Sequence, residues 1–148
     1  MKAIRRLALV ALVFFAATAA SAADTVIKSE AYKVLYTLKA DGSIQDASLK
    51  TVAYLGSDGS ILDASHRTLG RVKGDGAVQD ASYRTLGRVR EDGAIQDASY
   101  RNVGYIAKSG LIQGADYSTL AHVEGTGWDP SQVAAFWFFF RKASAVKP

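Results

Sequence analysis

Apolar residues that favour strands recur along this chain with a period of seventeen residues, and turn-forming residues lie between them. Counted from the Asp-Gly and Ser-Gly pairs, tandem units begin at Asp41, Asp58, Asp75, Asp92 and Ser109, without insertions. Positions 4, 12 and 15 of every unit carry Ile, Val or Leu. Residues 24–40 keep this pattern and are interpreted as a diverged sixth unit. Strict spacing indicates a repeat architecture, here with two short strands and two turns per unit.

Two turn signals alternate between the predicted strands. The first is Asp-Gly or Ser-Gly, which marks tight hairpins because glycine tolerates a positive φ. The second is "QDAS" or "LDAS", in which the Asp carboxylate can accept backbone N–H groups two residues further on. These aspartates recur as Asp46, Asp63, Asp80 and Asp97. Their repetition favours a structural role over a catalytic one, and no catalytic residue is expected.

Position 13 of the repeat is small in all five full units. Its residues are Ala53, Gly70, Gly87, Gly104 and Ala121. A strand position without a large side chain indicates that another backbone or a packed neighbour comes close.

The unit boundaries predict five hairpins, for example with arms at residues 83–90 and 94–99. Two arms are left over, at residues 25–31 and 117–124. If these two pair, the hairpins close into a ring without open strand edges, which would otherwise invite aggregation. An open row of hairpins is the alternative, and the pattern leaves open whether there are five or six petals.

Units of the form "DGxIQDASYRTLGRV" resemble the bacterial five-fold β-flower family, in which short hairpins radiate around a common axis. The resemblance covers residues 24–125. The last unit departs from the pattern, with Ser109 in place of Asp and with Gly114 and Asp116 in place of Asp and Ser. The resemblance implies an all-β fold of radially arranged hairpin repeats. It implies no specific activity, because the family has none established.

The chain ends do not follow the repeat. Residues 1–23 have a basic start, an apolar run and then small residues, the layout of a cleaved secretory signal peptide. A membrane anchor is the alternative, but the apolar run is shorter than the roughly 20 residues of a spanning helix. We therefore expect a periplasmic or secreted protein with a signal peptide (1–23), a hairpin repeat domain (24–125) and a C-terminal aromatic helix and tail (126–148).

Composition narrows the possible partners and cofactors. The chain has eighteen Lys and Arg residues and fourteen Asp and Glu residues, and three of the basic residues lie within residues 1–23. The remaining chain is nearly neutral, so a nucleic-acid partner is not expected. There is no cysteine, which excludes disulfides and cysteine-bound metals. We expect no cofactor and no metal site.

A short helix is predicted at about residues 130–141. Asp129 suits the N-cap, Pro130 the first helical position, and Gln132 has the spacing of a capping box. The segment 133–140 is apolar all round, and at about 1.5 Å per residue it is too short to span a membrane. One interpretation is a plug that docks on the axial surface of the flower.

Two other interpretations of this segment remain open. The first is contact with a partner or a membrane surface through exposed aromatic side chains. These side chains would be Phe136, Trp137, Phe139 and Phe140. The second is a β-strand at "AFWFFF", since aromatic residues favour strands.

Position 14 is the most varied among the repeats, and a binding site is expected where the copies differ. Its residues are Tyr54, Arg71, Arg88, Tyr105 and His122. By strand alternation they face away from positions 13 and 15 and share a side with position 12. In a closed ring they would form a circle of aromatic and cationic groups suited to an anionic glycan or another small polar ligand. Ordinary solvated side chains are the alternative.

The two histidines, His66 and His122, fall at positions 9 and 14 and suggest no catalytic or metal-binding cluster. The leading hypothesis is therefore an exported, non-enzymatic module that has a structural or interaction role in the bacterial envelope. Its partner would be an unidentified protein or envelope component, and an oligomer is an open alternative. The alternative is a small-ligand or glycan binder that uses position 14.

Overall fold

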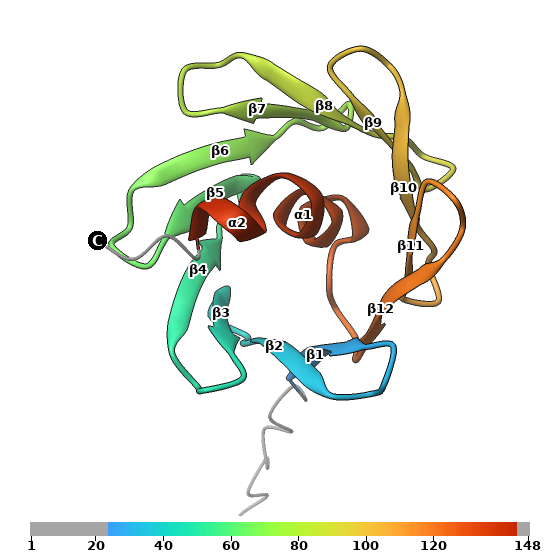
Figure 1. Cartoon of the computed structure of the whole chain (residues 1–148). Helices are drawn as coiled ribbons and strands as arrows, with labels where there is room; N and C mark the ends of the chain where they lie inside the picture. The colour runs from blue at the N-terminus through green and yellow to red at the C-terminus, as the bar shows by residue number, and fades with distance from the viewer. Residues whose placement is uncertain (1–23, 145–148) are drawn as a thin grey trace, which may run out of the picture.

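The computed structural model describes residues 24–144. Twelve antiparallel strands form a sheet that closes on itself, and a C-terminal helix lies in the middle of the ring (Figure 1). The predicted all-β class with a short C-terminal helix is confirmed. The predicted signal peptide at 1–23 and the tail at 145–148 lie outside the described residues.

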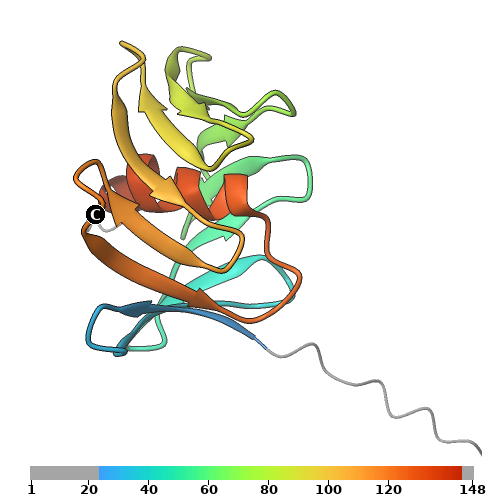
Figure 2. The same ribbon diagram turned by 90° about the vertical axis from the view of Figure 1, so that its right-hand side faces the viewer.

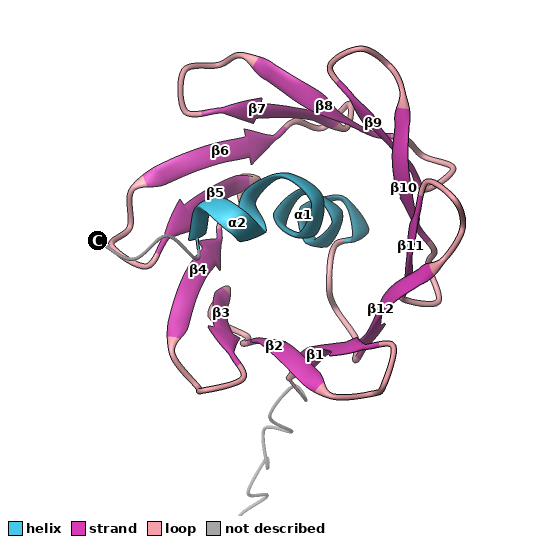
Figure 3. Ribbon diagram, in the orientation of Figure 1, coloured by secondary structure: helices cyan, strands magenta, loops and turns pink. Residues whose placement is uncertain are grey.

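The strands follow the repeat units closely (Figure 3). The longer ones are β2 (Val34–Leu38), β4 (Thr51–Leu55), β6 (Thr68–Val72), β8 (Thr85–Val89), β10 (Asn102–Ile106) and β12 (Thr119–Glu124). The shorter ones are β3 (Ser43–Asp46), β5 (Ser60–Asp63), β7 (Ala77–Asp80), β9 (Ala94–Asp97) and β11 (Leu111–Gly114), and β1 (Thr25–Ser29) precedes them. Strand β1 pairs with both β2 and β12, with Ile27 opposite Val123. The two leftover arms therefore close the ring, as predicted.

The ring holds six hairpins, β1–β2 through β11–β12. Five of the junctions between them are the Asp-Gly or Ser-Gly turns, whose glycines have φ between 85° and 97°. The sixth junction is the seam at which β1 meets β12. Because neighbouring strands run in opposite directions, the Asp-Gly turns gather at one end of the ring and the "DAS" turns at the other.

A β-bulge in every hairpin changes where position 12 points. In β6, Gly70 lies opposite Ile61 and Thr68 lies opposite Leu62, so Leu69 is an extra residue without a partner. The same shift occurs in the other five hairpins. In five copies the bulge residue packs against the core. The expectation that position 12 shares a side with position 14 is therefore wrong, since strand alternation does not hold across a bulge.

After β12 the chain enters one helix inside the ring. It begins as α1 (Pro130–Ala135), passes through a π-helical turn, η1 (Phe136–Phe140), and ends as α2 (Arg141–Ser144). The Asp129 carboxylate accepts hydrogen bonds from the N–H groups of Ser131 and Gln132, which confirms the predicted cap. The Gln132 amide instead donates to the Gly56 carbonyl at 2.6 Å, so it anchors the helix to the ring. The β-strand interpretation of this segment is wrong.

Three successive phenylalanines of the helix pack on three successive glycines of the ring. A Cβ added to Gly87 would stand 2.6 Å from the Phe139 ring, and Gly70 and Gly104 face Phe140 and Phe138 in the same way. The prediction that position 13 is small because a neighbour comes close is therefore confirmed.

The opposite side of the helix meets a large side chain. Tyr36 occupies position 13 of the first unit and packs edge-on against Phe136 and Trp137. The helix thus runs through the ring rather than lying on its axial surface (Figure 2). Within residues 24–144, no helix has the length and apolar character needed to cross a bilayer.

Candidate functional site

Position 14 lies on the outer wall of the ring, where its side chains meet residues from the next hairpin. Positions 13 and 15 point into the ring, so position 14 points outward. The contacts are Tyr54 with His66, Arg71 with Tyr83, Tyr105 with Tyr117, and His122 with Tyr32. We call these four contacts the outer-wall pairs. In the three aromatic pairs the rings are stacked, with centroids 4.2 to 5.1 Å apart.

The two remaining hairpin junctions carry the same positions without a stack. Arg88 and Tyr100 face the same sector of the wall and are both exposed. In the other junction the equivalent residues are Thr37 and Leu49, so these two positions supply neither a cation nor an aromatic ring. The wall is therefore repetitive in backbone and varied in chemistry.

The partner residue at position 9 has a left-handed backbone in all six copies. Its φ is between 60° and 65° at Tyr32, Leu49, His66, Tyr83, Tyr100 and Tyr117. This conformation costs a side-chain-bearing residue roughly 1 kcal/mol, whereas glycine or asparagine adopts it more easily. The chain uses glycine at the positive-φ position of each Asp-Gly turn, yet it places an aromatic residue at five of these six positions. The turn itself does not account for these aromatic rings.

The rings at position 9 are open to solvent. Tyr32, Tyr83, Tyr100 and Tyr117 are between 63 % and 75 % exposed. In the outer-wall pairs, the position-14 side chain covers one face of the position-9 side chain, and the rest of that side chain is in contact with water. Tyr32, Tyr83 and Tyr117 are thus each backed by a position-14 side chain and form accessible platforms, whereas Tyr100 is exposed without such a contact among the described residues.

Aspartates fix the turns that carry these rings. The Asp80 carboxylate accepts hydrogen bonds from the N–H groups of Ser82 and Arg84, at 2.8 and 3.0 Å, and from the Arg84 guanidinium. Asp46, Asp63 and Asp97 accept the same two backbone bonds, which confirms the predicted turns. The bond from the Arg84 N–H is the largest cause that lowers the pKa of Asp80. These carboxylates therefore serve the turn.

Arg71 and Arg88 are the cations at position 14. Within residues 24–144, neither has a carboxylate at ion-pair distance. The Arg71 Nε is buried and lacks a hydrogen-bond partner, while its guanidinium lies over the Tyr83 ring. Hydrogen bonds from Ser60 and Ala77 are the main causes that lower the pKa of Asp58 and of Asp75, respectively. The charges of Arg71 and Arg88 lower these two pKa values further. The two guanidinium groups therefore keep charge and donor capacity for a ligand.

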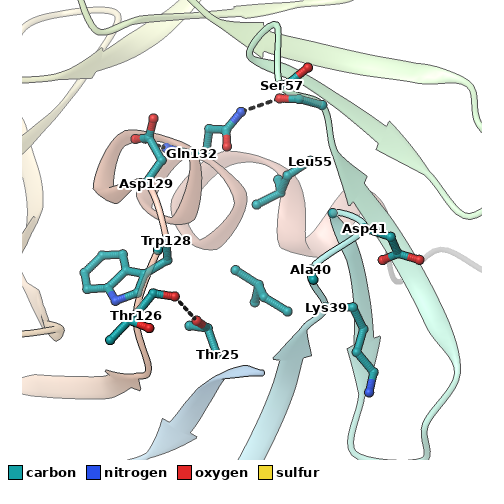
Figure 4. A pocket seen from close by; sticks show the side chains of 14 residues that line it. Thr25, Lys39, Ala40, Asp41, Leu55, Ser57, Thr126, Trp128, Asp129 and Gln132 are labelled. Atoms are coloured by element: carbon teal, nitrogen blue, oxygen red, sulfur yellow. Dashed lines mark hydrogen bonds between the residues drawn. The ribbon is translucent and has the colours of Figure 1, made fainter. Parts of the chain in front are cut away.

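The position-14 residues do not converge on one concavity, because each belongs to a different hairpin. A cavity of about 590 Å³ lies elsewhere, at the Asp-Gly end, between Leu38, Leu55 and Trp128 (Figure 4). Several polar groups lining it are already engaged, as Asp129 is with the helix N-terminus and Gln132 is with Gly56. A second cavity, of about 720 Å³, lies beside Arg141 at the other end. Position 14 thus forms an extended surface rather than a pocket.

Three of the four aromatic residues considered for partner contact are buried. Phe136, Trp137 and Phe140 are at most 5 % exposed, because they fill the inside of the ring. Phe139 is half-buried against Gly87. This corrects the hypothesis drawn from the sequence: a ring that packs in the core offers no surface to a partner or membrane.

Sequence reasoning did not identify position 9. The signal was present, since an aromatic residue follows the "AS" or equivalent dipeptide in most units. It became recognisable only with the backbone φ and the exposure of the rings.

The model of a protein family described as "5-fold beta-flower protein" matches residues 24–141. The chain is a β-flower protein. No curated protein and no solved structure matched it. The match continues past residue 125 into the helix, so the β-flower family unit includes the segment that fills the ring as well as the hairpins. The β-flower family is not a known enzyme family.

Proposed function

We propose that this β-flower protein is a non-enzymatic interaction module exported to the bacterial envelope, and that it binds through the outer wall of its ring. Support comes from position 9, where exposed aromatic rings recur on a left-handed backbone. If position 9 served only to form the turn, glycine or asparagine there would make the fold more stable. Export is supported by the signal-peptide pattern of residues 1–23.

A second candidate is binding of a glycan or small ligand through the varied position 14. Its residues are Tyr54, Arg71, Arg88, Tyr105 and His122. Because they are spread around the wall and four of them contact a position-9 side chain, they suit an extended ligand better than a compact one.

Co-sedimentation with isolated bacterial envelopes tests the proposed function. The test variant replaces Tyr32, Tyr83, Tyr100 and Tyr117 by Asn, which removes the rings but tolerates the left-handed backbone. The control replaces Ser57, Lys73, Glu91 and Lys108 by Asn, four exposed residues at the Asp-Gly end. We expect the wild type and the control to sediment with envelopes and the test variant to remain in solution. A wild type that stays in solution, or a test variant that sediments equally, would overturn the proposal.

A further inference from the structure

We propose that the outer wall binds an acidic polysaccharide with a disaccharide repeat, one repeat for each hairpin that has an aromatic ring at position 9. The strongest subsites are the two neighbouring sectors that contain Arg71 with Tyr83 and Arg88 with Tyr100. This inference deepens the proposed function, because it rests on binding through the outer wall.

The platforms have the chemistry that a sugar ring requires. A pyranose presents a face of C–H groups and an edge of hydroxyls, so it stacks on an exposed aromatic face while its edge forms hydrogen bonds. Tyr83 offers such a face, since it is 63 % exposed and is backed by Arg71. Gln79 lies opposite Arg71 on one side and Thr85 on the other, which places an amide and a hydroxyl on adjacent strands.

The charges of this sector favour an acidic sugar. Arg71 and Arg88 have no ion-pair partner among the described residues. The side chains of Arg84 and Arg101 flank them and are 81 % and 79 % exposed, although each contacts an aspartate. Asp58 and Asp75, the carboxylates influenced by Arg71 and Arg88, already accept turn hydrogen bonds. A carboxylate on the sugar would supply the ion-pair partner that the two guanidinium groups lack.

The spacing favours a chain over a single sugar. Equivalent positions on neighbouring hairpins are two strands apart, and at about 4.8 Å per strand the subsites repeat at roughly 10 Å. This distance is close to the length of one disaccharide. A chain that lies along the wall would engage successive subsites, and each further contact would raise the effective affinity without a new kind of interaction.

The same geometry argues against other occupants. A protein partner needs a contiguous, closely packed patch, whereas these rings are separated by polar side chains. A membrane surface would be met by side chains that project freely from one end of the ring. Tyr32 and Tyr117 are instead stacked on His122 and Tyr105 of the neighbouring hairpin, and Tyr83 lies under Arg71.

Isothermal titration calorimetry with hyaluronan oligosaccharides tests this inference, because their repeat is an alternating uronate and N-acetylhexosamine. Chito-oligosaccharides serve as the uncharged comparison, and dextran sulfate as a polyanion without the disaccharide repeat. We expect hyaluronan to bind with an affinity that rises with chain length and falls with salt. It should bind at least about tenfold more tightly than either comparison, since both stacking and charge contribute.

Two double variants and one control assign the binding to residues. Arg71→Gln with Arg88→Gln, and Tyr83→Asn with Tyr100→Asn, should each weaken hyaluronan binding by about tenfold or more. Leu49→Asn changes the position-9 residue that has no aromatic ring, on the same left-handed backbone, and it should bind like the wild type. Thermal unfolding of each variant establishes that it is folded before binding is measured.

The outcomes separate this inference from the proposed function. Absence of hyaluronan binding, equal binding of dextran sulfate, or an equal loss in Leu49→Asn would overturn the polysaccharide assignment. If sedimentation with envelopes still depended on the tyrosines in that case, binding through the wall would stand and only the acidic chain would be rejected. If sedimentation did not depend on them, both would be rejected.

Discussion

Tyr32 and His122 stack across the seam of the ring, with ring centroids 5.1 Å apart and planes inclined by 9°. Tyr32 lies in the turn after β1 and His122 in β12, so the two ends of the repeat domain form the contact that Tyr54 and His66 form inside it. The seam therefore has strand pairing in the wall and a stacked pair outside, like the junction between β4 and β5.

Separate and combined replacement of the two seam residues should reveal their coupling. We expect Tyr32→Asn and His122→Ala together to destabilise the fold by less than the sum of the single changes, with a coupling of about 0.5–1 kcal/mol. Denaturant unfolding of the four proteins measures it. The pair Tyr54 and His66 provides the comparison within the chain, and strictly additive changes at the seam would contradict a stabilising stack.

Gly87→Ala should destabilise the protein by about 1–3 kcal/mol, because overpacking of a filled interior forces its neighbours to move. The new Cβ would meet the Gln96 carbonyl as well as the Phe139 ring. Gly74→Ala is the matched control, since its Cβ would have no atom within 4 Å. Denaturant midpoints of both variants provide the measurement. Equal stability of the two would mean that the helix does not need the glycine at position 13.

Tyr100→Gly should leave the protein about 1 kcal/mol more stable than Tyr100→Ala. Tyr100 has φ of 62°, which glycine adopts without strain and alanine does not. Its side chain is 75 % exposed, so the two changes remove similar packing. Thermal unfolding compares the variants directly. If alanine were as stable as glycine, the backbone would be unstrained and the argument for a functional ring at position 9 would weaken.

Stability should fall at acid pH through the turn aspartates. Hydrogen bonds from backbone N–H groups, foremost those of Arg84 and Arg101, lower the pKa of Asp80 and Asp97 in the folded protein. A lowered folded pKa stabilises the native state above the unfolded value of about 3.9, and this contribution is lost as pH falls through the folded pKa.

Thermal unfolding between pH 7 and pH 2 checks this expectation. The melting temperature should change little until about pH 4 and then decrease. Asp80→Asn with Asp97→Asn keeps an oxygen acceptor in each turn but removes the charge, so its decrease below about pH 4 should be shallower. Parallel curves for the wild type and this variant would show that the two carboxylates do not carry the effect.

The sequence by itself determined the repeat and its turns, and it favoured a closed ring. Residues such as Ile44 and Asp46 recur at fixed positions, and local chemistry decides where strands and turns form. The leftover arms at both ends made ring closure the solution without open edges. The small residues at position 13 also indicated a close neighbour before that neighbour was known.

Only the tertiary structure decided what lies inside and outside the ring. The bulge at Leu69 reverses the simple alternation, because an unpaired residue shifts the register of its strand. The aromatic helix enters the ring because Gly70, Gly87 and Gly104 leave room for its rings, a fit between distant segments that no local pattern contains. Tyr83 meets Arg71 because neighbouring hairpins are adjacent on the wall. The candidate site is therefore a product of strand pairing, whereas the strands themselves are a product of local sequence.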